Sequence, residues 1–435
     1  MATQFSVDEG RRWKVPFFTI WTGQAVSLLG SQLVQFALIW HLTVETGSAT
    51  VLATASLVGL LPQVILGPLT GTLVDRWNRR VIMIVADGMI ALATVGLALV
   101  FAAGEVQLWH IYALMFLRSV GGGFHRPAMS ASTSLMVPKE QLARLQGINQ
   151  ALEGGLNIFS APLGALLLEI LPLQGILAID VVTAVIAITP LFFIAVPQPD
   201  RVTGIKDAEE KTSVWEETAA GVRYLTAWPG LLIVMLMASV VNLLVNPAFA
   251  LIPLLVKDHF NGGAPDLASL EFLVGVGYIL GGILLGVWGG FKRGVATSML
   301  GIMGVGVGTL LMGQLPAGSF NLALAAVTLI GISLPVTNGP LMALVQKAVS
   351  PDMQGRVMTL LFSVSTAMTP IGLAVSGPLA DRLGIQFWFT LGGISCVVMG
   401  LGFVLIPAVW NIEKDQSLQP SAGDGPEPVL AASND

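Results

Sequence analysis

Long apolar runs separated by short polar segments dominate this chain. Twelve runs reach the length of about 20 residues that a helix needs to cross a bilayer. They begin near Val15, Val51, Val81, Gln107, Leu145, Gly175, Gly230, Leu267, Ala296, Asn321, Val357 and Gln386. The pattern predicts an all-α membrane protein with twelve transmembrane helices. The first run is too long for the core of a cleavable signal peptide, so we expect it to be retained.

A polar interval divides the runs into six and six. We expect a cytoplasmic N-terminus at 1–14, a first six-helix half at 15–196, a linker at 197–228, a second half at 229–410 and a disordered tail at 411–435. In the linker, Trp215, Ala219, Val222 and Leu225 recur at helical spacing. This spacing predicts either an amphipathic helix on the membrane surface or an ordinary solvated helix.

The two halves carry a weak internal repeat. A shift of 213 residues places Arg79 and Arg80 on Lys292 and Arg293, and it also pairs Pro127 with Pro340, Met129 with Met342 and Pro138 with Pro351. Duplicated six-helix halves are typical of secondary transporters that rock about a central site.

Composition and charge support a membrane protein and give its orientation. Apolar residues make up 54% of the chain and charged residues only 11%, which excludes an ordinary soluble domain. With the N-terminus inside, 17 of the 21 Lys and Arg residues fall in cytoplasmic segments. The positive-inside rule therefore predicts that both termini are cytoplasmic. The single cysteine, Cys396, excludes a disulfide framework.

Four charged residues inside the apolar runs are candidates for chemistry. Arg118 needs a partner because an arginine at the centre of a span is unfavourable, and Glu153 lies at a matching depth in the next run. We expect Arg118 and Glu153 to pair, either for coupling or as a static link. Asp87 is expected to pair with the arginines of the 76–80 loop. Asp180 has no evident partner and is a candidate protonatable carboxyl, and the second half has no charged residue well inside any run.

Uncharged polar residues follow one face of several runs. They either line a substrate cavity or bridge helices by hydrogen bonds. Phe36 is added to this set as an aromatic contact for a bulky apolar ligand. The cavity candidates are Gln24, Ser31, Gln35, Phe36, Gln150, Asn157, Asn242, Asn246, Ser363 and Thr366.

Motifs of soluble enzymes are absent from the sequence. It contains no GxxxxGK[ST], HExxH or GxSxG pattern, and its four histidines are scattered. We therefore expect no enzyme activity, no metal, no cofactor and no nucleic acid partner.

The stretch GTLVDRWNRR, residues 71–80, resembles the loop signature G-x-x-x-D-R-x-G-R-[RK] of the major facilitator superfamily. The resemblance implies that Gly71 lets two helices pack closely. It also implies that Asp75, with Arg76, Arg79 and Arg80, forms a cytoplasmic gate lock against the start of the eleventh helix. Asn78 replaces the usual glycine and can still adopt a left-handed turn.

Further segments resemble the bacterial macrolide efflux (Mef) group of this superfamily. Arg118 and Gly122 match the second motif R-x-x-x-G, whose arginine is associated with coupling, and Pro162 keeps part of the antiporter signature. WTGQAVSLLGSQ, FHRPAM, VPKEQL and KDHFNG are similar to Mef segments. Members of that group have a neutral amide at the position of Glu153, so the resemblance assigns no proton-relay role to this residue.

The resemblance implies a multi-pass protein of the bacterial cell membrane, in contact with lipid and working as a monomer. We expect it to export a bulky, mostly apolar, macrolide-like drug in exchange for protons. The alternatives are transport of another small metabolite or siderophore and, in a different class, a membrane scaffold without transport.

Overall fold

The computed structural model describes residues 13–198, 222–226, 228–349 and 351–412, which are helical almost throughout and contain no strand. The long helices are α2 (Lys14–Thr46), α3 (Ala49–Arg76), α4 (Arg79–Ala103), α5 (Leu108–Met136), α6 (Lys139–Ile170), α7 (Leu173–Phe193), α9 (Pro229–Ala250), α11 (Ala264–Trp288), α12 (Gly294–Gln314), α13 (Phe320–Ala348), α14 (Pro351–Leu383) and α15 (Ile385–Gly402). The short elements are α10 (Ile252–Leu254), the π-helical turn η1 (Leu255–His259), the 3₁₀ turn η2 (Phe403–Leu405) and α16 (Pro407–Trp410).

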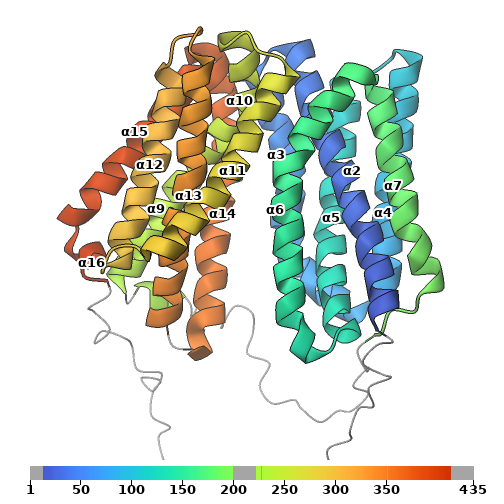
Figure 1. Cartoon of the computed structure of the whole chain (residues 1–435), viewed down its shortest axis with the longest axis horizontal. Helices are drawn as coiled ribbons and strands as arrows, with labels where there is room; N and C mark the ends of the chain where they lie inside the picture. The colour runs from blue at the N-terminus through green and yellow to red at the C-terminus, as the bar shows by residue number, and fades with distance from the viewer. Residues whose placement is uncertain (1–12, 199–221, 227, 350, 413–435) are drawn as a thin grey trace, which may run out of the picture.

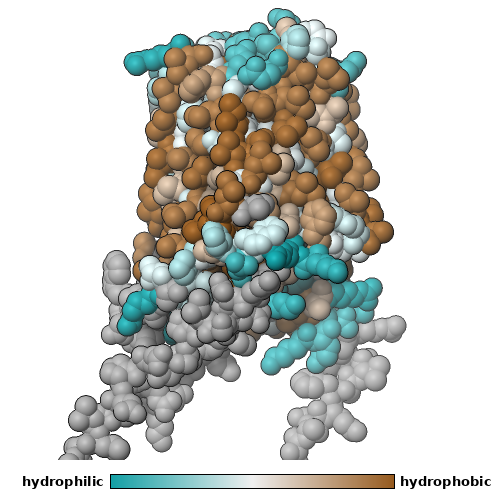
Figure 2. All heavy atoms as spheres, turned by 90° about the vertical axis from the view of Figure 1, so that its left-hand side faces the viewer, coloured by the Kyte–Doolittle hydropathy of each residue, from teal (hydrophilic) through white to brown (hydrophobic). Residues whose placement is uncertain are grey.

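Eleven of these helices are long and apolar enough to cross a membrane. They match eleven of the twelve expected runs. The long helix outside this group is α5, whose apolar character is interrupted by His110, Arg118, His125 and Arg126. On the face drawn in Figure 2, hydrophobic side chains form a broad band between hydrophilic ends, as a bilayer requires.

The helices form two bundles that stand side by side (Figure 1). The first bundle contains α2–α7, in which α2 packs against α6 and α7, and α4 against α5 and α7. The second bundle contains α9–α16, in which α12 packs against α13 and α15, and α14 against α9. The bundles meet through α3 with α14 and through α6 with α11.

The bundles lean together at one end only (Figure 1). We call this the closed end, where α2 ends and α3 begins; the terminal end is the one where α2 begins and α16 lies. At the closed end a single apolar cluster joins both bundles, with Leu42 and Leu52 on one side and Leu251 and Leu254 on the other. Burial of apolar side chains therefore seals this end.

The predicted linker helix is described only in part. Trp215 and Ala219 lie outside the described residues. Leu225 is 3% exposed and packs with Tyr224 and Trp228 in the core of the second bundle. This part of the linker therefore packs on protein. Most of the predicted tail, from residue 413 onward, also lies outside the described residues.

Glycines let α12 and α15 approach closely. A Cβ atom added at Gly393 would lie 2.6 Å from the nitrogen of Leu310 and 2.8 Å from the carbonyl oxygen of Gly306. Small residues at such crossings are typical of helix pairs in membranes.

We expect Gly393→Val to destabilise the protein by about 1–3 kcal/mol, because the added atoms overpack this crossing. The measurement is the thermal unfolding midpoint in detergent. Gly282→Val is the matched control, since a Cβ at Gly282 meets no atom within 4 Å. Equal midpoints for the two variants would contradict the prediction.

Candidate functional site

A cavity of about 430 Å³ lies inside the first bundle, lined by α2–α5. Its polar wall comes mainly from α2, whose polar residues recur every three or four positions and so share one helix face. The predicted cavity residues Gln24, Ser31 and Gln35 all line it. Asp87, Arg118, His125 and Arg126 add the charged and titratable groups.

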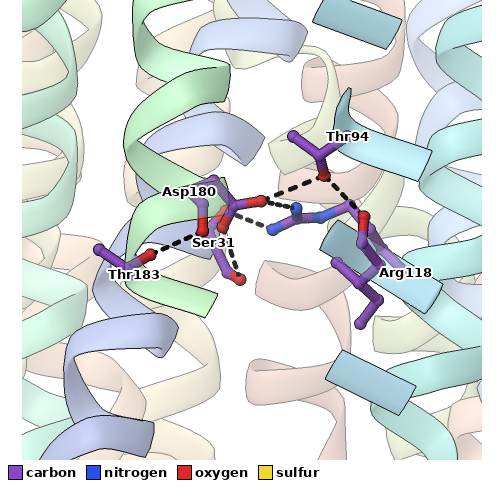
Figure 3. A network of polar contacts seen from close by, with 6 residues as sticks. Ser31, Thr94, Arg118, Asp180 and Thr183 are labelled. Carbon is purple, nitrogen blue, oxygen red and sulfur yellow. Dashed lines mark hydrogen bonds and ion pairs between the residues drawn. The ribbon is translucent and has the colours of Figure 1, made fainter. Parts of the chain in front are cut away.

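The buried ion pair at this cavity joins Arg118 to Asp180 (Figure 3). The Arg118 Nη1 and Asp180 Oδ2 atoms are 2.6 Å apart, and the side chains are 11% and 2% exposed. The hydroxyls of Ser31 and Thr94 also donate to Asp180, at 3.2 Å and 3.3 Å. Arg118 Nη2 donates to the Ser31 carbonyl at 2.9 Å. The pair thus links α5 and α7 with α2 and α4.

The expected partner of Arg118 was therefore wrong. Glu153 is exposed on α6, a helix that packs against α2 and α11. Matching depth along the membrane normal does not determine the direction in which a side chain points. Asp180, expected to lack a partner, is the counterion. Gly30 favours this arrangement, because its missing side chain leaves room for Thr183, next to Asp180, against α2.

A second polar cluster contains Asp87. The Gln24 amide donates to Asp87 Oδ2 at 3.0 Å, and His125 Nε2 lies 3.5 Å from the same oxygen. When His125 is protonated this contact is an ion pair. Sequence reasoning missed His125, although its position two turns beyond Arg118 on α5 was a usable signal.

The expected pairing of Asp87 with the loop arginines was also wrong. Arg79 donates to the Ala131 carbonyl at 2.9 Å, and its Nη2 lies 3.5 Å from Asp75. Arg80 donates to the carbonyls of Leu191 and Phe192 at the end of α7. Helix C-termini attract cations through their unpaired carbonyls.

A cavity of about 210 Å³ lies between the bundles. It shares Gln32 and Gln35 with the larger cavity, so the two adjoin. Its lining combines Phe36 and Ile39 of α2, Asn157 and Ser160 of α6, and Leu267 and Glu271 of α11. The predicted residues Gln35, Phe36 and Asn157 meet here.

Glu271 corrects the expectation that the second half has no charged residue well inside a span. The sequence places the start of this run at Leu267, which would put Glu271 close to the membrane surface. The helix begins at Ala264, and Glu271 lies two turns inside it and is exposed to the cavity.

The remaining candidates divide into bonded and exposed residues. The Asn246 amide donates to Asn242 at 2.8 Å and to Thr369 at 3.1 Å, so Asn242 and Asn246 bridge α9 and α14 and border neither cavity above. Gln150 and Ser363 are exposed and Thr366 is partly exposed.

Asp75 of the predicted gate loop faces solvent at the terminal end, whereas Arg79 of the same loop is buried. The Asp75 side chain is 74% exposed, and a Cβ at Gly71 would meet no atom within 4 Å, so the close packing expected at Gly71 is absent in this arrangement. Asn78 has φ −70° and ψ 111°, and its side chain caps α4 by accepting from the Arg80 and Val81 N–H groups. It therefore acts as an N-cap and not as a left-handed turn residue.

Two polar contacts cross between the bundles at the closed end. Asp381 at the end of α14 accepts from the N–H groups of Ala49 and Thr50, at 2.7 Å and 3.0 Å, and from the Ser48 hydroxyl at 3.0 Å. Lys257 donates to the carbonyls of Thr43 and Val44 at the end of α2, at 3.0 Å and 3.2 Å. Each contact caps a helix of the other bundle with the favourable charge.

Known proteins resemble this chain over most of its length. The family model "Major Facilitator Superfamily" matches residues 20–373. The chain is 37% identical to Macrolide efflux protein A of Streptococcus pyogenes, over 94% of this chain and 99% of that protein. It is 35% identical to Macrolide efflux protein A of Enterococcus faecalis, over 75% and 100%.

Solved structures share the fold at low identity. A bacterial homologue of the iron transporter ferroportin in an inward-facing state gives a TM-score of 0.68 at 15% identity, covering 90% of this chain and 98% of that one. The nucleoside transporter NupG gives 0.65 at 14%, covering 88% and 98%.

We expect Arg118→Ala or Asp180→Ala to cost about 3–5 kcal/mol of unfolding free energy, because each leaves a buried charge without its partner. The double variant should lose less than the sum of the single losses, since the two residues form one unit. The thermal unfolding midpoints of the parent protein, the two single variants and the double variant, measured in detergent, test this expectation. Arg126→Ala, which removes an exposed arginine of the same helix, should change the midpoint little. Additive losses would show that the pair does not stabilise the fold.

Proposed function

The chain belongs to the Major Facilitator Superfamily, and from this membership we propose that it exports bulky, mostly apolar, macrolide-like drugs by alternating access. It is a multi-pass bacterial membrane protein. The observation that carries the export proposal is its 37% identity to Macrolide efflux protein A over 94% of the chain. The cavities inside and between the bundles supply a place for such a substrate.

We propose a topology of twelve spans with both termini in the cytoplasm. In this topology α5 completes the set of twelve. The charged residues of α5 are compatible with a span. Arg118 is paired with Asp180, and the side chains of His125 and Arg126 face the cavity and not lipid. The terminal end then faces the cytoplasm, which places most Lys and Arg residues inside. The structure then corresponds to an inward-open state closed on the outside.

We propose that export is coupled to proton entry. Arg118 and Asp180 neutralise each other's charge in their ion pair, which favours a structural role for both. Asp87 and His125 form a buried titratable pair at the cavity wall, with Arg126 as the further cation there. This pair is the better candidate for carrying a proton.

We expect energised inside-out vesicles that contain the protein to take up a labelled macrolide, and an uncoupler to abolish the uptake. Asp75→Ala should lower uptake without lowering expression, since it removes the acid of the gate loop. Vesicles without the protein are the control. Absence of uptake for every macrolide tested would reduce the relation to the efflux proteins to one of fold alone.

A further inference from the structure

Glu271 is a carboxylate that no role described so far uses. It is exposed to the cavity between the bundles, two turns inside α11. Among the residues that the structure describes, no side chain forms a hydrogen bond or ion pair with it. A carboxylate at such a depth is unfavourable unless a ligand, water or a proton satisfies it, and such residues commonly mark transport sites.

The surroundings of Glu271 suit a cation. The cavity is lined by the side-chain amides of Gln32, Gln35 and Asn157, whose oxygens can accept hydrogen bonds from an ammonium group. It is also lined by Phe36, whose ring face attracts cations. Among the described residues that line this cavity of about 210 Å³, none is Lys, Arg or His. The volume fits the amine end of a drug. The larger cavity, reached past Gln32 and Gln35, leaves room for the apolar body.

We propose that Glu271 binds the protonated amine of the substrate. This inference rests on the proposed export function and narrows its substrates to drugs with a basic nitrogen. The amine lies between α2 and α11, so both bundles contact the ligand.

The test is binding of two labelled macrolides to the purified full chain. One carries a dimethylamino sugar, and the other is the same macrolide with that nitrogen made neutral. Glu271→Gln should weaken binding of the basic macrolide by about 10- to 100-fold, as expected for loss of a hydrogen bond to a charged group. It should leave binding of the neutral macrolide unchanged, which also shows that the variant folds.

Glu271→Asp, which keeps the charge, should retain the preference for the basic macrolide. Glu169→Gln on α6, outside this cavity, is the control. Equal weakening of both macrolides, or no weakening, overturns the inference. Selective weakening in a protein that transports neither macrolide supports the site and refutes the export function, so the two failures can be told apart.

A different observation concerns the closed end. The motif at the end of α3, GTLVDR at residues 71–76, has a second copy at the end of α14, GPLADR at residues 377–382. Both read G-x-L-x-D-R. α3 and α14 pack against each other across the bundles, and the second motif lies beside the start of α3. Since the two helices run antiparallel, the first motif and the start of α14 both lie at the terminal end.

The family resemblance implies that the aspartate of the first copy, Asp75, contacts the start of a helix in the other bundle. The aspartate of the second copy makes a contact of this kind. Asp381 caps α3 through the N–H groups of Ala49 and Thr50. A Cβ at Gly377 would lie 2.7 Å from Thr50 Cα, so only glycine permits this approach. At the terminal end, neither Gly71 of the first copy nor Gly355 near the start of α14 has an atom within 4 Å of its added Cβ, so the two helices do not pack closely at these positions.

We infer that the two copies form alternative locks of the same chemistry. Asp381 holds the closed end in this state. Asp75 takes the equivalent place on α14 when the terminal end closes, as the family resemblance already implies for it. Rocking of the bundles prevents both contacts from forming together.

The test uses spin labels at Glu105 and Gly318, which lie in closed-end loops of the first and second bundle, in a Cys396→Ala background. Asp381→Asn should raise the ratio of molecules with a long distance between the two labels to molecules with a short one by about 10-fold. The reason is that the substitution removes a charged helix cap at the closed end. Asp75→Asn should lower that ratio, and the double variant should return toward the parent protein.

Glu45→Gln, an exposed acid at the end of α2, is the matched control. Distances in Asp381→Asn that equal those of the parent protein, or an equal shift in the control, overturn the inference.

Discussion

A charged side chain inside an apolar helix must find its partner within the protein, and the first bundle depends on how Arg118 meets this constraint. Asp180 supplies the opposite charge, and Ser31 and Thr94 occupy its remaining acceptor positions. Taking two charges out of water is unfavourable, and good geometry with additional hydrogen bonds offsets that penalty. One carboxylate therefore ties α7 to α2, α4 and α5. The polar wall of the larger cavity is built on these same helices, so its shape is fixed by the pair.

The second bundle is held by backbone proximity and uncharged hydrogen bonds. Glycines bring α12 against α15, and Asn242, Asn246 and Thr369 join α9 to α14. Each bundle is thus internally bonded. Among the residues that the structure describes, the polar contacts between the bundles at the closed end are those of Asp381 and Lys257. Separating that end breaks few polar contacts and exposes one apolar cluster. This distribution of bonds suits rigid-body rocking better than rearrangement inside a bundle.

Much of the helical framework follows from hydropathy, because a span has to be long and apolar. The sequence also places Gln24, Ser31 and Gln35 on one face of α2, since helical spacing determines which residues share a face. Partners between helices do not follow, because depth in the membrane says nothing about direction around the helix axis. For this reason depth alone predicts Glu153 as the partner of Arg118, whereas the structure pairs Arg118 with Asp180. Glu271 was missed because a boundary error of one turn hid its depth. Asn242 and Asn246 were predicted as cavity residues but bridge two helices, because a polar helix face can serve either purpose.

The cavity around Glu271 takes its walls from both bundles, and this limits what a ligand there can do. Phe36 comes from α2 and Glu271 from α11, while Lys257, just before α11, holds the end of α2. Opening the closed end moves α2 from α11 and removes one wall. A ligand on both walls therefore stabilises the present state, because a ligand shifts an equilibrium only by its difference in affinity between the states. Export from such a site requires other interactions to stabilise the opposite state. A terminal-end lock that repeats the chemistry of Asp381 would offset the hydrogen bonds that break at the closed end.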